Sequence, residues 1–306
     1  MEFAALINKM VIFVVLMVIG YVCARRGFTD AAFTQITSKL VINVFMSATI
    51  LKSVLDTESS MVLSDVLRAL LFLSLTIAFC FVVGGAVTRL LRVDREHAAI
   101  FELLTALGNT MFIGVPVAQA VLGSLSVFYI SLSNVAFNVI LYTYGVWRLK
   151  GGGTGAAIRV RDMLSVPLIA TTLSLLIFLL RIPLPQVLLE LTSAMSGATM
   201  PLSMLVIGTS LGTVRLTDAF RNSQLYLASF VKLILGPALV ALLGRFVISD
   251  RILLLTCVII AACPGAVMAS VLSIQYGKDY VYASEGVLQS TALSMLTIPA
   301  LLYFFA

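Results

Sequence analysis

Two stretches of the sequence contain residues that could bind a small anion inside an apolar environment. Pro116 lies near Gly114 in the first stretch, and Pro264 is followed by Gly265 in the second. Proline removes an amide donor and clashes with the preceding helical turn, so each stretch should break a helix and leave amides unpaired after it. Amides at a helix N-terminus carry roughly half a positive charge and bind anions such as carboxylates. The two prolines therefore predict an anion site built from backbone.

Polar side chains close to the first proline could complete such a site. Asn109 and Thr110 precede Pro116 by about two helical turns. Asn134 lies in the next apolar run, four residues before Asn138. These side chains can bind a polar ligand, or they can join two helices through hydrogen bonds that contribute about 0.6 kcal/mol on average. The residues alone leave both interpretations open.

Ionisable residues inside apolar runs are unfavourable to bury and point to function. Lys232 is one such residue. Asp65 and Arg68 stand three residues apart at the start of another run, where a surface ion pair of little consequence and a proton-sensitive pair at a cavity mouth both fit. We treat these three residues as candidates for supporting the site or coupling it to an ion. Glu102 lies near the start of its run and is expected to extend to the membrane interface.

The composition indicates a membrane protein that crosses the bilayer several times. The 306 residues are 60% hydrophobic and only 11% charged, whereas soluble domains average about 25% charged residues. The net charge of +6 comes mostly from loops, where basic residues set topology, so we expect no nucleic-acid partner.

The motifs of several other protein classes are absent from the sequence. The four cysteines form no C-x-x-C pair and the chain has one histidine, so we expect no metal site, no disulfide and no cofactor. No nucleotide-binding loop and no hydrolase motif occurs, so we expect no catalytic residues and no enzyme activity.

Ten mostly apolar runs of about 18 residues or more are present, and each is long enough to cross a hydrocarbon core of about 30 Å. The sequence thus predicts an all-α fold with ten transmembrane helices, the fourth and ninth of which are broken. The predicted helices are 5–24, 35–55, 66–91, 98–122, 124–149, 163–180, 187–214, 224–248, 252–275 and 282–305.

A glycine-rich segment, residues 151–162, separates five runs from five, so residues 1–150 and 163–306 are predicted to be two repeats. Because each half has an odd number of spans, the second half must enter the membrane from the opposite face, as an inverted repeat. Paired interruptions in two such halves point to a transporter's binding site near the middle of the membrane.

Basic residues favour the loops that follow odd-numbered helices by more than two to one, which predicts that these loops are cytoplasmic and both termini extracytoplasmic. The residues on the predicted cytoplasmic side are Arg25, Arg26, Arg89, Arg92, Arg95, Arg148, Lys150, Arg159, Arg161, Arg215, Arg221 and Lys278. Those on the other side are Lys52, Arg68, Arg181, Arg245 and Arg251.

Four segments resemble the auxin efflux carrier family, which comprises plant PIN-type carriers and bacterial permeases within the bile acid, arsenite and riboflavin transporter-like superfamily. The first two are G-N-T-M-F-I-G-V-P-V (108–117) and P-G-A-V-M-A-S-V-L-S-I-Q-Y-G (264–277), which resemble the two crossover segments of that family. The other two are A-T-M-P-L-S-M-L-V-I-G-T-S-L (198–211) and S-M-L-T-I-P-A-L-L-Y (294–303), and the resemblance covers nearly the whole chain.

The resemblance implies two inverted five-helix repeats whose fourth and ninth helices cross at their prolines, an elevator-type alternation, and carboxylate substrates. Asn109 matches the asparagine that lines the substrate site of plant carriers, and Pro116 and Pro264 match the crossover prolines. Asp65 matches the acid of a supporting acid–lysine pair, but Arg68 is one residue out of register with the base.

Several departures from the plant pattern argue against auxin as the substrate. Leu168, after Pro167, stands where plant carriers have a substrate-contacting asparagine. The segment Phe45–Thr49 lacks a proline found in many bacterial members, and a short linker replaces the long plant loop. A small metabolic carboxylate such as malonate or malate is therefore the expected substrate.

The sequence thus predicts a secondary transporter of a small organic anion in the cell inner membrane. A sodium-coupled symporter of the bile-acid type and a passive anion channel are the alternatives. The expected partners are the anion, the lipid bilayer and a coupling ion, either a proton or sodium. Monomer and homodimer both stay open.

Overall fold

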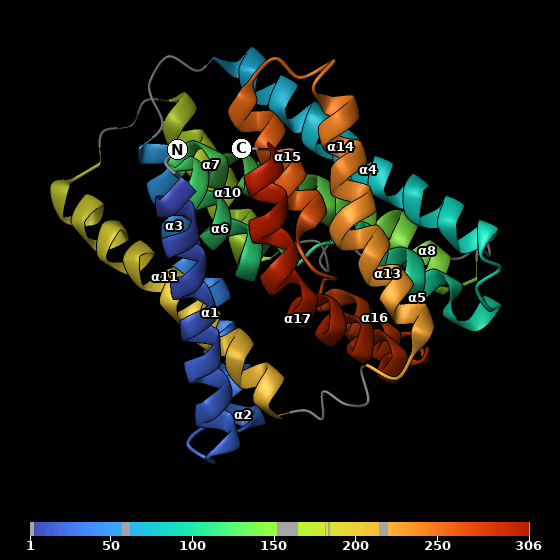
Figure 1. Ribbon diagram of the computed structural model, residues 1–306. Helices are drawn as coiled ribbons and strands as arrows, with labels where there is room; N and C mark the ends of the chain where they lie inside the picture. The colour runs from blue at the N-terminus through green and yellow to red at the C-terminus, as the bar shows by residue number, and fades with distance from the viewer. Residues whose placement is uncertain are drawn as a thin grey trace. The chain divides into compact units, whose positions relative to one another are not determined.

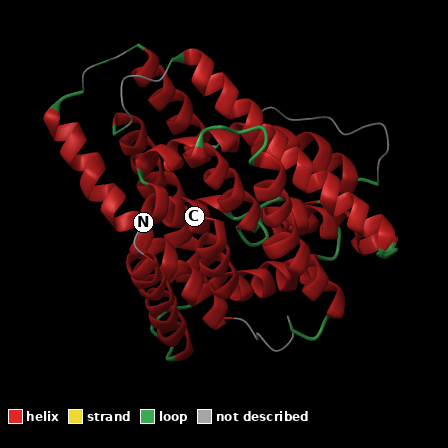
Figure 2. Ribbon diagram, turned by 45° about the horizontal axis from the view of Figure 1, so that its top comes forward, coloured by secondary structure: helices red, strands yellow, loops and turns green. Residues whose placement is uncertain are grey.

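The computed structural model describes residues 3–56, 62–151, 165–180, 182, 184–213 and 220–305. In these ranges the regular structure is entirely helical, and no strand occurs (Figures 1 and 2). Most of the predicted linker, residues 152–162 with Arg159 and Arg161, lies outside the described residues, and so do Arg181 and Arg215.

Six helical segments of the described chain are long and apolar enough to cross a membrane: Ala31–Leu55, Leu63–Leu90, Ser124–Leu149, Gln186–Thr213, Ser223–Gly244 and Tyr280–Phe304. Shorter apolar helices cover Val11–Arg25, Thr110–Leu122, Val166–Leu179 and Arg251–Ala262. Many side chains on these helices are large, apolar and exposed, as expected of surfaces that face lipid. The protein is therefore a helical, multi-pass membrane protein.

The chain divides into two compact units, and each takes segments from both halves of the sequence. The first unit contains residues 1–70, 111–132 and 164–215, and the second contains 71–110, 133–163 and 216–306. Two helices, α4 (Leu63–Leu90) and α7 (Ser124–Ile140), contribute residues to both units.

The first unit is built around the long helix α11 (Gln186–Thr213), which continues through Pro201. It also includes α1 (Phe3–Arg25), α2 (Ala31–Leu40), the π-helical turn η1 (Val41–Phe45), α3 (Met46–Leu55), most of η2 (Thr110–Gly114), α6 (Val115–Leu122) and α10 (Val166–Leu179). Helix α1 packs along α11 (Figure 1).

Glycine allows α1 and α11 to approach closely. A Cβ atom added at Gly208 of α11 would lie 2.0 Å from the carbonyl oxygen of Met17, and one added at Gly20 of α1 would lie 2.3 Å from that of Leu205. Such close approach is typical of membrane helices. Lipid tails are as apolar as the side chains, so the hydrophobic effect does not drive the helices together, and small residues let the two backbones pack closely instead. The hydroxyls of Thr49 on α3 and Thr199 on α11 are 2.7 Å apart and join a second helix to α11.

The second unit surrounds α5 (Arg95–Ala106), whose residues from Ala99 onward are buried. Its other elements are most of α4, the end of α7, η3 (Leu141–Gly145), α8 (Val146–Leu149), α13 (Ser223–Phe230), η4 (Val231–Leu235), α14 (Gly236–Gly244), α15 (Arg251–Ala262), α16 (Met268–Gln275) and α17 (Tyr280–Phe305). The widened turn η4 precedes Pro237, which lacks the amide needed to continue a regular α-helical pattern.

Candidate functional site: a backbone crossover in the second unit

Two helices of the second unit end in extended backbone at equivalent points. Helix α5 ends at Ala106, Leu107 is extended with ψ 128°, and the chain becomes helical again only at Thr110. Helix α15 ends at Ala262, Cys263 is extended with ψ 139°, and α16 begins at Met268. Both interrupted stretches of the sequence are therefore non-helical, as their glycine, asparagine and proline content predicts.

The two extended segments pair with one another. Gly108 and Gly265 form an isolated antiparallel bridge. The amide of Asn109 donates to the carbonyl of Pro264 at 2.8 Å, and the amide of Ala266 donates to that of Leu107 at 3.0 Å. Backbone groups that the helices leave unpaired are thus satisfied inside the protein, which is the condition for irregular backbone at membrane depth.

Glycine at position 108 is required by the close approach of the second segment. A Cβ atom there would lie 2.9 Å from both the Cβ of Cys263 and the carbonyl oxygen of Ile260. It would also lie 3.3 Å from the Nζ of Lys232. The crossover therefore has no room for a larger side chain at this point.

The two prolines do not occupy equivalent places, contrary to the expected crossing at Pro116 and Pro264. Pro264 belongs to the extended segment and supplies a bridging carbonyl. Pro116 lies in the first turn of α6, about two turns after the break at Gly108 and Asn109. Pro116 follows the widened turn η2, as Pro237 follows η4, so the helix that begins at Thr110 accommodates a residue without an amide donor. The break therefore lies in the predicted segment, but at Gly108 and Asn109 rather than at Pro116.

The first two amides that follow Pro264 are occupied. The amide of Gly265 donates to the Oγ of Ser290 on α17 at 3.0 Å, and the amide of Ala266 donates to the carbonyl of Leu107. These two amides are therefore not available to the expected anion site. Ser290 was not anticipated, since one serine in an apolar helix gives no signal that separates it from many others.

Lys232 brings a cationic side chain to the crossover. It lies in η4, its side chain is 1% exposed, and its Nζ donates to the carbonyl of Ala106, the last residue of α5, at 3.3 Å. That carbonyl lies at the negative end of the α5 dipole, which favours a cation. No carboxylate lies within 4.0 Å of the Lys232 ammonium in the described part of the chain. The ammonium is therefore held by backbone rather than by an ion pair.

The polar candidates near the first break have different surroundings. Asn109 is part-buried, and its backbone amide donates to the carbonyl of Pro264. Thr110 is buried, with 5% of its surface exposed. Asn134 is 7% exposed, and its carbonyl accepts from the Nδ2 of Asn138 at 2.8 Å. The structure therefore brings together Asn109, Pro264, Gly265 and Lys232, while Asn134 lies on α7 of the same unit.

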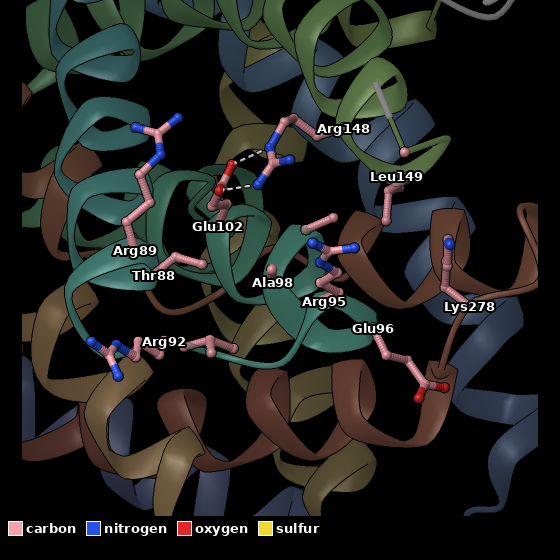
Figure 3. Close-up of a pocket in the computed structure, with 13 residues that line it drawn as sticks. Thr88, Arg89, Arg92, Arg95, Glu96, Ala98, Glu102, Arg148, Leu149 and Lys278 are labelled. Carbon is pink, nitrogen blue, oxygen red and sulfur yellow. Dashed lines mark hydrogen bonds and ion pairs between the residues drawn. The ribbon is translucent and has the colours of Figure 1, made fainter. Parts of the chain in front are cut away.

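The Glu102 side chain is buried and paired rather than exposed. Its side chain is 1% exposed and forms a two-point ion pair with Arg148 of α8, whose Nε lies 2.7 Å from Oε2 (Figure 3). The hydroxyl of Tyr144 donates to the same oxygen at 3.4 Å. A buried carboxylate needs such a partner, but the partner is 46 residues away in sequence and the pattern of α5 alone could not identify it.

The remaining candidates, Gly114, Asp65 and Arg68, belong to the first unit. Asp65 accepts from the amide of Val62 at 3.2 Å near the start of α4. Arg68 is exposed, and no ion pair joins it to Asp65. The expected acid–base pair is therefore not formed between these two described residues.

Comparison with known proteins gives the class of this chain. The sequence pattern of the family described as membrane transport proteins matches residues 5–162 and 154–302, which is nearly the full length. The chain belongs to this family, which includes the auxin efflux carriers. Membership agrees with the resemblance seen in the crossover segments, and it fits a multi-pass helical protein.

Two relatives of this family member are transporters whose substrates their names do not give. An uncharacterized transporter of Methanocaldococcus jannaschii is 26% identical over 307 residues, which cover 95% of this chain and 96% of the relative. An uncharacterized transporter of Methanothermobacter thermautotrophicus is 23% identical over 286 residues and 93% of each chain. The similarity is thus to whole transporters rather than to one domain of them.

Proposed function

We propose that this family member is a secondary transporter that moves a small organic anion, such as malonate or malate, across the cytoplasmic membrane. The observation that carries this proposal is the buried Nζ of Lys232 at the backbone crossover. In its protonated form this group attracts an anion strongly, because water does not screen it. A carboxylate bound there gives Lys232 the counter-charge that the described residues do not supply.

The carboxylate is proposed to lie against the Lys232 ammonium, with hydrogen bonds from the side chains of Asn109 and Thr110. Pro264 and Gly265 then act by fixing the backbone of the crossover, since the amides of Gly265 and Ala266 already have acceptors. Asn134 is proposed to make a further polar contact with the anion. Gly114 and Pro116 are proposed to shape the helix that follows Thr110.

The architecture proposed for transport is ten spans in two inverted five-helix repeats, residues 1–150 and 163–306. The division into compact units supports it, because residues 1–70 and 164–215, from corresponding parts of the two halves, belong to one unit, together with residues 111–132 of the first half. In an elevator-type cycle, the second unit carries the anion with the crossover, and the first unit, with α1, α2, α3, α10 and α11, is the scaffold. Such a movement must expose Lys232, which is buried in this structure.

Both termini are proposed to be extracytoplasmic in the inner membrane, as the loop charges indicate. Reporter fusions at the C-terminus test this orientation. A C-terminal reporter that is active only in the cytoplasm and shows full activity would overturn it.

The transport energy is proposed to come from an ion gradient or from the substrate gradient, because the sequence has no nucleotide-binding loop. Unwound carbonyls hold the coupling sodium in some transporters. Here Lys232 already occupies the Ala106 carbonyl, which argues against sodium at that position. Uptake into proteoliposomes under imposed sodium, proton and electrical gradients distinguishes these cases, and accumulation that responds to none of them would contradict active transport.

A thermal-shift titration of purified protein with carboxylates of two to six carbons tests the binding site. A ligand that binds the folded state raises the melting temperature as its concentration exceeds Kd. Asn109→Ala should weaken Kd about tenfold, since it removes a hydrogen bond to a charged group. Asn138→Ala is the matched control, because the Asn138 side chain donates within its own helix. An unchanged Kd in Asn109→Ala places the site elsewhere.

A further inference from the structure

A cavity of the second unit lies at the opposite end of α5 from the crossover. Its volume is about 470 Å³. Ala106, where the crossover begins, is about 16 Å along the helix axis from Arg95, which lines the cavity. The charged lining residues are Arg89, Arg92, Arg95, Arg148, Lys278, Glu96 and Glu102 (Figure 3). We call this the basic cavity.

The described lining of the basic cavity carries a net positive charge. Five basic and two acidic lining residues give a formal charge of +3. Glu102 is already paired with Arg148, and in Figure 3 these two side chains face one another. The other four bases form no ion pair within 4.0 Å with any described residue. The cavity therefore presents several cations that lack a counter-charge.

Asp279, which follows the lining residue Lys278, has other partners. Asp279 accepts from the Nε2 of His97 at 3.2 Å and from the amide of Tyr282 at 3.0 Å. The hydrogen bond from the Tyr282 amide, helped by that from His97, lowers the pKa of Asp279. Its carboxylate is thus engaged at the start of α17. Among the neighbouring bases, Lys150 lies over the ring of Tyr276, 5.3 Å from its centroid.

The start of α5 adds to the positive potential. The first turns of this 12-residue helix line the cavity through Arg95, Glu96, Ala98 and Ala99. Asp94, the residue before the helix, makes no capping hydrogen bond with its side chain. An uncapped helix N-terminus attracts anions, above all phosphates, through its free amides and its dipole.

Apolar side chains flank these cations in the chain. Leu90 and Leu91, between Arg89 and Arg92, are 82% and 44% exposed, and Trp147, next to Arg148, is 40% exposed. Tryptophan is enriched where a membrane meets water. A ligand with an anionic head and an apolar tail matches this combination, whereas a soluble anion would leave the apolar residues unused. Topology alone requires basic loops but does not require them to surround a cavity.

We propose that the basic cavity binds the phosphate of an anionic phospholipid headgroup. Basic pockets between transmembrane helices are suited to such headgroups, because the phosphate replaces water at several cations together. The site is separate from the crossover and does not depend on which anion the protein transports.

The test is a thermal-shift titration of the purified full-length protein with dioctanoyl phosphatidylglycerol. Dioctanoyl phosphatidylcholine and inorganic phosphate serve as parallel ligands. The pocket variant is Arg92→Gln with Arg95→Gln. The matched control is Arg26→Gln with Arg221→Gln, which removes two exposed arginines outside the cavity, both on the side assigned to the cytoplasm.

Phosphatidylglycerol should raise the melting temperature of the wild type and of the control variant, with Kd about thirtyfold weaker in the pocket variant. Equal weakening in the control would mean attraction to overall charge and would overturn the proposal. Equal stabilisation by phosphatidylcholine would overturn it as well. Stabilisation by inorganic phosphate with no further effect of the lipid would assign the cavity to a soluble phosphate and refute the lipid assignment.

Discussion

Lys232 and Arg148 are two basic residues of the same unit, held in opposite ways. The guanidinium of Arg148 forms a two-point ion pair with Glu102, and its side chain is 26% exposed. The side chain of Lys232 is 1% exposed, and among the described residues its Nζ has a backbone carbonyl as its acceptor. A paired charge is committed to the fold, whereas a charge held at a helix end can still accept an anion. Function is therefore better sought at Lys232.

The comparison is tested most strongly by breaking the ion pair. Arg148→Gln leaves the Glu102 carboxylate buried without a cation, so the free energy of unfolding should fall by about 3 kcal/mol. Glu102→Gln should lower the free energy of unfolding by less, because the Arg148 side chain is partly exposed and can be hydrated. Chemical unfolding in detergent measures both. If the double variant is more stable than Arg148→Gln alone, the two side chains interact as a pair. If the two single variants lose the same free energy of unfolding, burial of the unpaired Glu102 carboxylate is not the cause.

A smaller effect is expected from crowding the crossover that holds Lys232. Gly108→Val places atoms against Cys263 and the Ile260 carbonyl, and overpacking of this kind should lower the free energy of unfolding by about 2 kcal/mol. Gly197→Val on α11 is the control, since a Cβ atom there meets nothing within 4 Å. If both variants unfold alike, the crossover is not tightly packed.

Lys232 itself should contribute little to stability. Lys232→Met keeps most of the side-chain volume and removes a buried charge, so the free energy of unfolding should change by less than about 1 kcal/mol in either direction. Carboxylate binding, measured by the thermal-shift titration, should nevertheless be lost. A large loss of stability would show that Lys232 is structural, like Arg148, and would remove the contrast between the two residues.

The smallest effect concerns Asp279, a charge paired outside the membrane spans. Its folded pKa lies below the ordinary value of 3.8, so the group stabilises the protein above that value. This contribution is lost as the pH falls through the lowered pKa. The melting temperature of the wild type should therefore fall more steeply than that of Asp279→Asn between about pH 5 and pH 3. Parallel curves would show that the hydrogen bonds from the Tyr282 amide and from His97 to Asp279 contribute nothing to stability.

The helical class and the two interruptions could be predicted because they depend on local composition. Gly108, Asn109, Pro264 and Gly265 are poor helix residues inside apolar runs, and the structure breaks both helices there. The family also follows from these motifs. Helix boundaries such as Val166 and Leu179 differ by a few residues from those expected, because flanking residues tolerate either state.

The partners of each residue could not be predicted, because they come from distant segments. Gly265 bonds to Ser290, Lys232 to Ala106 and Glu102 to Arg148, and no periodicity records such pairs. The position of Pro116 was misjudged for a related reason. A proline marks where a helix cannot continue normally, but it does not say whether the break precedes it by one residue or by seven.

The π-helical turns have a consequence for how this family is aligned. A π-turn closes its hydrogen bond over five residues instead of four, so each one acts as a single-residue insertion in a helix. One of them, Val231–Leu235, contains Lys232, and another begins at Thr110, directly after the break. Deletion of one residue from Val231–Leu235 should let the widened turn close as a regular α-turn, so that the side chains on either side keep their directions. A relative that lacks the extra residue is therefore expected to keep the same helix face toward the crossover, with a single-residue gap at the π-turn.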